Sequence, residues 1–288
     1  MCGVALRKKK GEKTMKLGII NGWQEGHFRA VKAKGLDAVE FCINHNYDSA
    51  EVLAQKEEIK ANSEKYGVAV GSIGRWGMRR IDDDGAIIPE ALQHDKNLID
   101  LASFVGCPVF NCGCNYTEGK TYYENCQIAI DYFGRLIDYA KGKNVKIAVY
   151  NCDWANFVWC EKAWSVVMGA LPELGIKYDP SHSVHRGTDC YKELHDWVSR
   201  VYHFHLKGTM MIAGESVDDP PVGLDDLNWR AVMSILYAGG YDGMLSIEPH
   251  SHLWRGARGQ WGIDFTINYM RPFIMPADYP ADDDPYMP

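Results

Sequence analysis

Eight short, β-rich apolar runs recur along this 288-residue chain and constrain its fold more than any other feature. Each run is rich in Val, Ile and aromatic residues, which is typical of parallel strands buried on both faces. The runs cover residues 16–22, 37–44, 68–74, 108–114, 146–152, 176–182, 201–208 and 244–250.

Stretches with helical periodicity separate these runs. Residues 91–106 carry apolar side chains at i, i+3 and i+4 spacing and end at a glycine, and residues 123–144 and 228–240 also end on glycine-containing stops. Strands that alternate with helices predict βαβ units. Eight units in 288 residues predict a single-domain α/β fold, the (β/α)8 TIM barrel. A doubly wound open sheet is the main alternative, but no G-x-G-x-x-G follows the first strand.

The chain divides into three predicted parts. Residues 1–14, with the basic stretch RKKKGEK, are predicted to be an N-terminal extension or a start-site artefact, with a basic binding arm as the alternative. The barrel is expected over residues 15–275. Residues 276–288 are rich in Pro and Asp and are expected to form an extended tail.

Composition argues against two classes of partner. A net charge of −7 and a pI near 5.8 disfavour nucleic acid, whose binding surfaces are usually basic. No apolar run reaches the roughly 18 residues that span a bilayer. The sequence has nine cysteines and no recognised secretion signal. We therefore expect reduced thiols and a cytoplasmic location.

Polar residues gather at the carboxyl ends of the predicted strands, where a (β/α)8 barrel carries its active site. They are Glu40, Asn44 and His45 after the second strand, Arg75 and Trp76 after the third, Asn151 and Asp153 after the fifth, Asp179 and His182 after the sixth, His203, His205 and Lys207 on the seventh, and Glu248, His250 and His252 after the eighth.

Asp179, His205 and Glu248 come from three successive strands and are candidates for one metal site. Two oxygens and one nitrogen suit Mn²⁺, Mg²⁺, Co²⁺ or Zn²⁺, and the absence of thiolates disfavours a structural zinc site. Taken singly, each residue also has an ordinary structural explanation, such as a turn for Asp179 or a core position for His203. Their recurrence at successive strand ends favours a metal or catalytic cluster.

Three segments carry a family resemblance: YDPSHS (178–183), VYHFHLKG (201–208) and DLNWRAVMSILYAGGYDGMLSIEPH (226–250). They resemble the xylose-isomerase-like TIM barrel superfamily, which includes sugar isomerases, ketose 3-epimerases and dehydratases. The resemblance covers roughly residues 15–275. It implies a divalent metal, with Mn²⁺ as the expected ion, held by Asp179, His205 and Glu248, and a substrate-binding role for His182.

The fifth strand departs from the pattern of the superfamily. Asn151 stands where the epimerases usually carry a Glu that shuttles a proton. The amide oxygen of Asn151 can ligate a metal, so we expect it as a fourth ligand, but an amide cannot act as the base. Asp153, His250 or Lys207 can compensate for the missing carboxylate.

The resemblance implies a metal-dependent sugar isomerase or epimerase, which forms an enediolate next to a metal-polarised carbonyl. We expect Glu248 to be ligand and base, and His182 and Asp153 to be further catalytic residues. The residues expected to bind the substrate are His182, Arg75, Trp76, Lys207 and Arg255. For Trp76, stacking on a sugar and hydrophobic cover over the barrel are equal alternatives. Arg255, with Arg258, binds a phosphate or carboxylate or lies in a solvated loop.

Two other functions stay open. One is a lyase or dehydratase that eliminates a group from a 3-keto-glycoside or related keto-sugar, because elimination needs only one well-placed base and an acid. The other is a non-catalytic sugar-binding barrel. The expected partners are a small-molecule sugar and further copies of the chain, as a dimer or tetramer like many relatives, with no nucleic acid or membrane.

Overall fold

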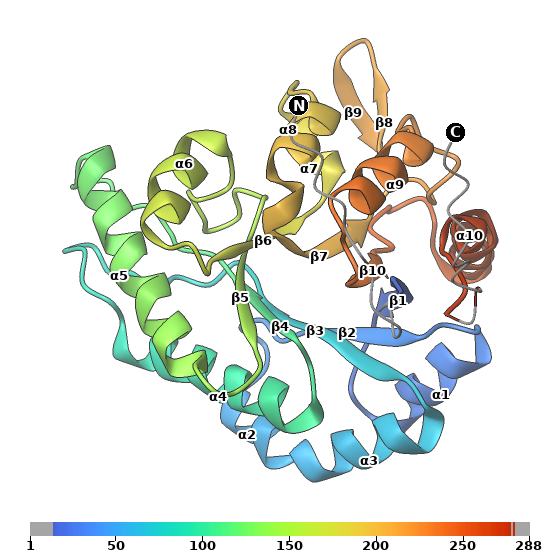
Figure 1. Cartoon of the computed structure of the whole chain (residues 1–288), viewed down its shortest axis with the longest axis horizontal. Coiled ribbons are helices and arrows are strands. Elements are labelled where there is room, and N and C mark those ends of the chain that lie inside the picture. The colour runs from blue at the N-terminus through green and yellow to red at the C-terminus, as the bar shows by residue number, and fades with distance from the viewer. Residues whose placement is uncertain (1–13, 278, 280–288) are drawn as a thin grey trace, which may run out of the picture.

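A closed barrel of eight parallel strands forms the centre of the computed structural model, which describes residues 14–277 and 279 (Figure 1). Each strand overlaps one of the eight predicted apolar runs, so the predicted fold class is confirmed. The strands lie in the order β1-β10-β7-β6-β5-β4-β3-β2. They are β1 (Lys16–Ile20), β2 (Ala38–Cys42), β3 (Ala69–Arg75), β4 (Val109–Cys112), β5 (Lys146–Tyr150), β6 (Gly175–Tyr178), β7 (Val201–Leu206) and β10 (Met244–Ile247).

Helices surround the strands (Figure 1). They are α1 (Glu25–Ala33), α2 (Ser49–Ala54), α3 (Lys56–Tyr66), α4 (Pro89–Val105), α5 (Tyr122–Ala140), α6 (Glu161–Ala170), α7 (Pro180–His185), α8 (Cys190–Trp197), α9 (Trp229–Ala238) and α10 (Gly256–Met270), with 3₁₀ turns η1 (Val198–Arg200) and η2 (Arg271–Phe273). The predicted helices correspond to α4, α5 and α9. Thr121 and Glu124 form a capping box that begins α5, and Gly106 ends α4 with a φ of 74°.

The apolar core lies between the barrel and its helices. It includes Phe28, Leu98, Phe133, Trp164 and Leu236, all fully buried. Burial of this layer is the main stabilising term of the fold, because each large apolar side chain contributes about 1.5–3 kcal/mol when removed from water.

The lumen of the barrel, by contrast, contains polar side chains. Glu40 of β2 lies 2.9 Å from His203 of β7, yet β1 and β10 separate these two strands in the sheet. The two side chains therefore meet across the interior. Asn111 of β4 and Ser72 of β3 form another buried pair, in which the Asn111 amide donates to the Ser72 hydroxyl at 2.8 Å.

One element was not predicted from the sequence. The antiparallel hairpin β8 (Met210–Ile212) and β9 (Glu215–Asp218) lies outside the barrel sheet and projects from it after β7 (Figure 1). β8 has only three residues, and β9 is short and mostly polar, so neither gives a strand signal of its own.

The two predicted terminal parts, 1–14 and 276–288, lie outside the described residues except for four positions at their inner ends. Within the described part of the chain, no helix is long and apolar enough to cross a membrane.

Candidate metal centre

The three expected metal ligands come together at the carboxyl ends of neighbouring strands. Asp179 follows β6, His205 lies near the end of β7, and Glu248 follows β10. One ligand atom from each lies within 4.8 Å of the other two. The sequence prediction of these three side chains as one group therefore agrees with the geometry.

Asp179 is held by the start of helix α7. Its Oδ1 accepts hydrogen bonds from the Ser181 backbone N–H at 2.9 Å and from the Ser181 hydroxyl at 2.7 Å. Its Oδ2 is buried without a hydrogen-bond partner and lies 3.3 Å from Lys207 Nζ and 3.4 Å from His182 Nε2. One carboxylate oxygen is thus fixed by the fold, and the other remains available for a ligand.

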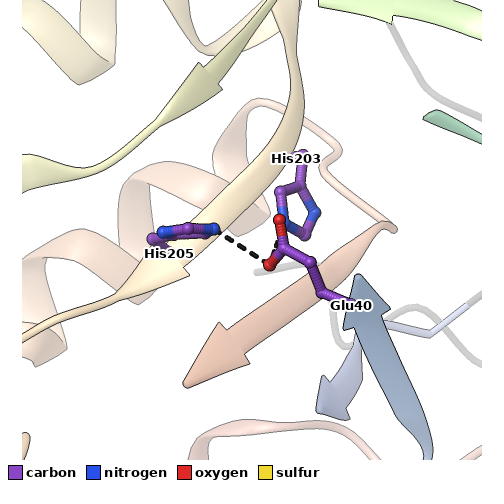
Figure 2. A group of neighbouring side chains, drawn as sticks. All are labelled: Glu40, His203 and His205. Atoms are coloured by element: carbon purple, nitrogen blue, oxygen red, sulfur yellow. Dashed lines mark hydrogen bonds and ion pairs between the residues drawn. The ribbon is translucent and has the colours of Figure 1, made fainter. Parts of the chain in front are cut away.

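His205 lies between two carboxylates. Its Nδ1 is 2.8 Å from Glu248 Oε2. On the other side of the ring, its Nε2 is 2.9 Å from Glu40 Oε2 (Figure 2). His203 Nε2 approaches the same Glu40 oxygen at 2.9 Å, so Glu40, His203 and His205 form a second group with metal-ligating atoms. The sequence named Glu40 as a strand-end residue but gave no sign that it reaches β7 across the barrel.

Charge at the centre is set by competition between burial and neighbours. Burial opposes ionisation of Glu40, Asp179 and Glu248, but interactions with nearby imidazole and ammonium groups outweigh it and lower all three carboxyl pKa values. The neighbours are chiefly His203 and His205 for Glu40, Lys207 for Asp179, and Lys207 with His205 for Glu248. The centre therefore carries ionised carboxylates at neutral pH.

Lys207 and His182 flank the free oxygen of Asp179. Burial disfavours the charged form of Lys207, but Asp179 and Glu248 raise its pKa above the usual value. Burial lowers the pKa of His182 to about 3 despite Asp179, and Lys207 adds to this effect. Lys207 is thus a buried ammonium, and His182 is a neutral imidazole 3.3 Å from it.

Asn151 and Asp153, the two β5-end residues expected at the site, are not brought into this group. The Asn151 side chain is buried against the backbone of Asp179: its Nδ2 donates to the carbonyl at 2.8 Å, and its Oδ1 accepts from the N–H at 2.9 Å. It therefore holds β5 to the end of β6. Asp153 is exposed and belongs to neither metal-ligating group.

Tyr150 is the last residue of β5, and its side chain is fully buried beside Trp76. Its ring stacks with Trp76 at a centroid distance of 6.1 Å, and Trp76 lies 6.2 Å from the His205 ring. Tyr150 was not predicted from the sequence, which pointed to Asn151 instead; side chains alternate along a strand, so a shift of one residue changes the face.

Trp76 and Arg75 point to different places. The Trp76 ring folds back over the end of β3, where a Cβ on Gly74 would lie only 2.0 Å from it. Arg75 is buried instead beside a separate cavity of about 440 Å³, which His45 and His94 also line. Its Nη1 donates to the Ile43 carbonyl at 3.2 Å. The Arg75 side chain thus contacts the backbone after β2 and lies outside the three-ligand group.

The predicted site residues in the loop after β10 are more exposed than the three-ligand group. Arg255 is exposed, and its Nη2 donates weakly to the His250 carbonyl at 3.5 Å; Arg258 is exposed as well. His250 Nδ1 pairs with Asp219 at the end of the unpredicted hairpin at 2.7 Å. The hairpin is thereby tied to the loop that follows Glu248.

The residues present fit a divalent metal ion. Asp179 and Glu248 offer carboxylate oxygens, His205 offers an imidazole nitrogen, and Asp179 Oδ2 is buried without a hydrogen-bond partner. Two oxygens and a nitrogen are a donor set for Mn²⁺, Co²⁺, Zn²⁺ or Mg²⁺.

Fold and site together define a TIM-barrel protein with a carboxylate–histidine group at its catalytic face. The family described as "Xylose isomerase-like TIM barrel" matches residues 28–269. The chain belongs to this family, and its fold is of the sugar isomerase and epimerase type. A search of the curated proteins found no match.

Solved structures repeat the architecture at low sequence identity. The 3-keto-D-glucoside 4-epimerase YcjR from E. coli is 16% identical with a TM-score of 0.71, over 90% of this chain and 99% of its own. The IOLI protein with a bound zinc atom is 17% identical with a TM-score of 0.69, over 90% and 98%. The probable 3-DHS dehydratase AsbF from Bacillus anthracis is 12% identical with a TM-score of 0.68, over 88% and 99%. At these identities the likeness establishes the fold.

Proposed function

We propose that this chain is a divalent-metal-dependent isomerase or epimerase of a sugar or keto-sugar, with Mn²⁺ as the first candidate ion. The observation that carries the proposal is the convergence of Asp179, His205 and Glu248 within 4.8 Å at the catalytic end of the barrel. The epimerase and the zinc-bound protein among the structural neighbours support the same reaction class and a metal.

Glu248 is the residue we assign as the base. Its side chain is 23% exposed, whereas those of Asp179 and Glu40 are fully buried. A substrate can therefore reach Glu248 but not the other two carboxylates. A divalent ion held by the three ligands would polarise the carbonyl and hydroxyl oxygens of the sugar.

Lys207 and His182 are assigned to the substrate oxygens. The charged Lys207 can donate a hydrogen bond to an oxygen that gains negative charge when Glu248 removes the adjacent proton. The neutral His182 can hold a hydroxyl group. Trp76, whose ring lies near those of His205 and Tyr150, is the candidate for stacking on the sugar. Arg75 and Arg255 remain weaker candidates, because the first is turned away and the second is exposed. Asp153 has no contact that supports a catalytic role.

A second candidate function is elimination from a keto-sugar, as in a lyase or dehydratase. The specific observation is that β5 ends in Tyr150, and that Asp153, the exposed carboxylate after it, belongs to neither metal-ligating group. One base and one acid suffice for elimination, and Glu248 with Lys207 can supply them. A homo-oligomer and a cytoplasmic location remain predictions from the sequence.

Metal analysis followed by a substrate screen tests the proposal. Protein purified without added metal is expected to contain close to one Mn, Co, Zn or Mg per chain, and Asp179→Ala and Glu248→Ala to lose it. Asp153→Asn is the matched control, because it removes an exposed carboxylate next to the site and should keep the metal.

Deuterium incorporation from D₂O into a panel of ketoses and 3-keto-glycosides then reports proton removal. An epimeric or isomeric product supports the first function, and an unsaturated product supports the second. Sugar binding without exchange would favour the non-catalytic barrel. No metal, even after soaking with each ion, would overturn the metal-dependent mechanism.

A further inference from the structure

Glu40 is a fully buried carboxylate in the lumen of the barrel that the proposed reaction does not use. It comes from β2 and meets His203 and His205 of β7, both through one oxygen, Oε2 (Figure 2). Its other oxygen, Oε1, has no hydrogen-bond partner. A buried carboxylate with so few partners is costly unless it serves the site above it.

The two metal-ligating groups share His205 and compete for it. One group uses the Nδ1 side of the ring, which faces Glu248, and the other uses the Nε2 side, which faces Glu40. A neutral imidazole has one nitrogen with a lone pair and one with a proton. If Nδ1 is the metal ligand beside Asp179 and Glu248, then Nε2 carries the proton, and Glu40 accepts it at 2.9 Å.

We propose that Glu40 is a positioning residue for the metal centre. It fixes the tautomer and ring orientation of His205, so that Nδ1 points toward an ion shared with Asp179 and Glu248. This inference rests on the proposed metal site. It also implies that the barrel holds one ion, because Glu40 and His203 act behind His205 and do not form a second site.

His203 completes the arrangement. Its Nε2 lies 2.9 Å from Glu40 Oε2, and its ring packs edge-on against His205 at a centroid distance of 5.3 Å. His203 thereby restricts the Glu40 carboxylate to the side of the lumen where it meets His205. When one ring nitrogen of a histidine binds a metal, the other carries the N–H. Carboxylates that accept this N–H typically raise metal affinity 10- to 100-fold.

The variant Glu40→Gln tests the role with little change in volume. Its neutral amide can accept from His205 Nε2–H only through Oε1, so the charge-assisted hydrogen bond that holds the tautomer is lost. Co²⁺ titration, followed by d–d absorption, gives affinity, stoichiometry and a spectroscopic signature of the site. We expect one Co²⁺ per chain in the wild type, and a Kd that is about 10- to 100-fold higher in Glu40→Gln, with an altered absorption band.

Ser72→Ala is the matched control. Ser72 is buried and pairs in register with Glu40, but no hydrogen bond joins it to His205. Its Kd for Co²⁺ should equal that of the wild type. Circular dichroism and thermal unfolding verify that the variants fold. If Glu40→Gln does not fold, Glu40→Asp, which keeps the charge but shortens the reach, should weaken Co²⁺ binding in the same direction.

The outcomes separate this inference from the proposed function. Equal Kd values for wild type and Glu40→Gln, with unchanged absorption, would overturn the positioning role and leave the metal centre intact. Two Co²⁺ ions in the wild type and one in Glu40→Gln would overturn it in favour of Glu40 as a direct ligand. A wild type that binds no Co²⁺ would remove the metal centre itself.

Discussion

Two buried charged clusters in this barrel are built in opposite ways. Arg80, between β3 and α4, donates through Nε to Asp95 at 2.8 Å and to Tyr132 at 2.9 Å, and through both Nη atoms to backbone carbonyls and Asp95. Tyr132 donates in turn to Asp95. In this outer cluster the guanidinium and the carboxylate are fully engaged.

The central cluster leaves hydrogen-bonding capacity unused. Glu40 Oε1, Asp179 Oδ2 and His203 Nδ1 are buried without hydrogen-bond partners. Folded proteins rarely leave such atoms unpaired unless a ligand or a function requires it. The comparison indicates that the outer cluster stabilises the fold, whereas the central cluster is arranged to bind a ligand.

The largest expected effect is at the centre and concerns activity. Glu248→Gln removes both a metal-ligating charge and the assigned base. It should lower kcat/KM for the substrate found by the screen by at least about 10³-fold, or about 4 kcal/mol of transition-state stabilisation. Stability should change little, because the side chain is partly exposed. Steady-state kinetics and urea unfolding measure the two quantities. Near wild-type turnover would remove Glu248 as the base.

The next effect is at the outer cluster and concerns stability. Asp95→Ala leaves the Arg80 guanidinium buried without its carboxylate, which should lower the free energy of unfolding by about 3–5 kcal/mol. Co²⁺ affinity of the folded variant should match the wild type. Asp131→Ala, which breaks an exposed ion pair with Arg135, is the control and should unfold like the wild type. A loss of metal affinity in Asp95→Ala would contradict the division between the clusters.

This division also explains what the sequence could reveal. The barrel was predictable because parallel strands buried on both faces read as continuous apolar runs. Asp179, His205 and Glu248 could be proposed as a group because they lie at the carboxyl ends of such runs, where barrels carry their sites. The hairpin β8–β9 was not, since its few residues gain their structure from contacts with the loop after β10.

The positions of Tyr150 and Glu40 could not be predicted, because they depend on strand register and on closure of the barrel. Whether Tyr150 or Asn151 faces the mouth is decided by a one-residue alternation that strand boundaries alone do not fix. Glu40 and His205 are 165 positions apart in the sequence. They meet because the sheet closes into a barrel in which only β1 and β10 lie between β2 and β7. Neither fact is written in a local pattern.

The smallest expected effect separates the two regions through a matched pair of tryptophans. Trp164, in the helical layer, donates through Nε1 to the Val158 carbonyl at 2.9 Å, whereas Trp76 lies over His205 and Tyr150 at the mouth. Trp164→Phe should cost about 1–3 kcal/mol of unfolding free energy, because it leaves that buried carbonyl unpaired, and KM should stay the same. Trp76→Phe should raise KM about 2- to 10-fold through weaker stacking on the sugar, with a smaller loss of stability. If Trp76→Phe lowers stability and leaves KM unchanged, Trp76 is hydrophobic cover over the barrel, and the substrate is held by His182 and Lys207 without it.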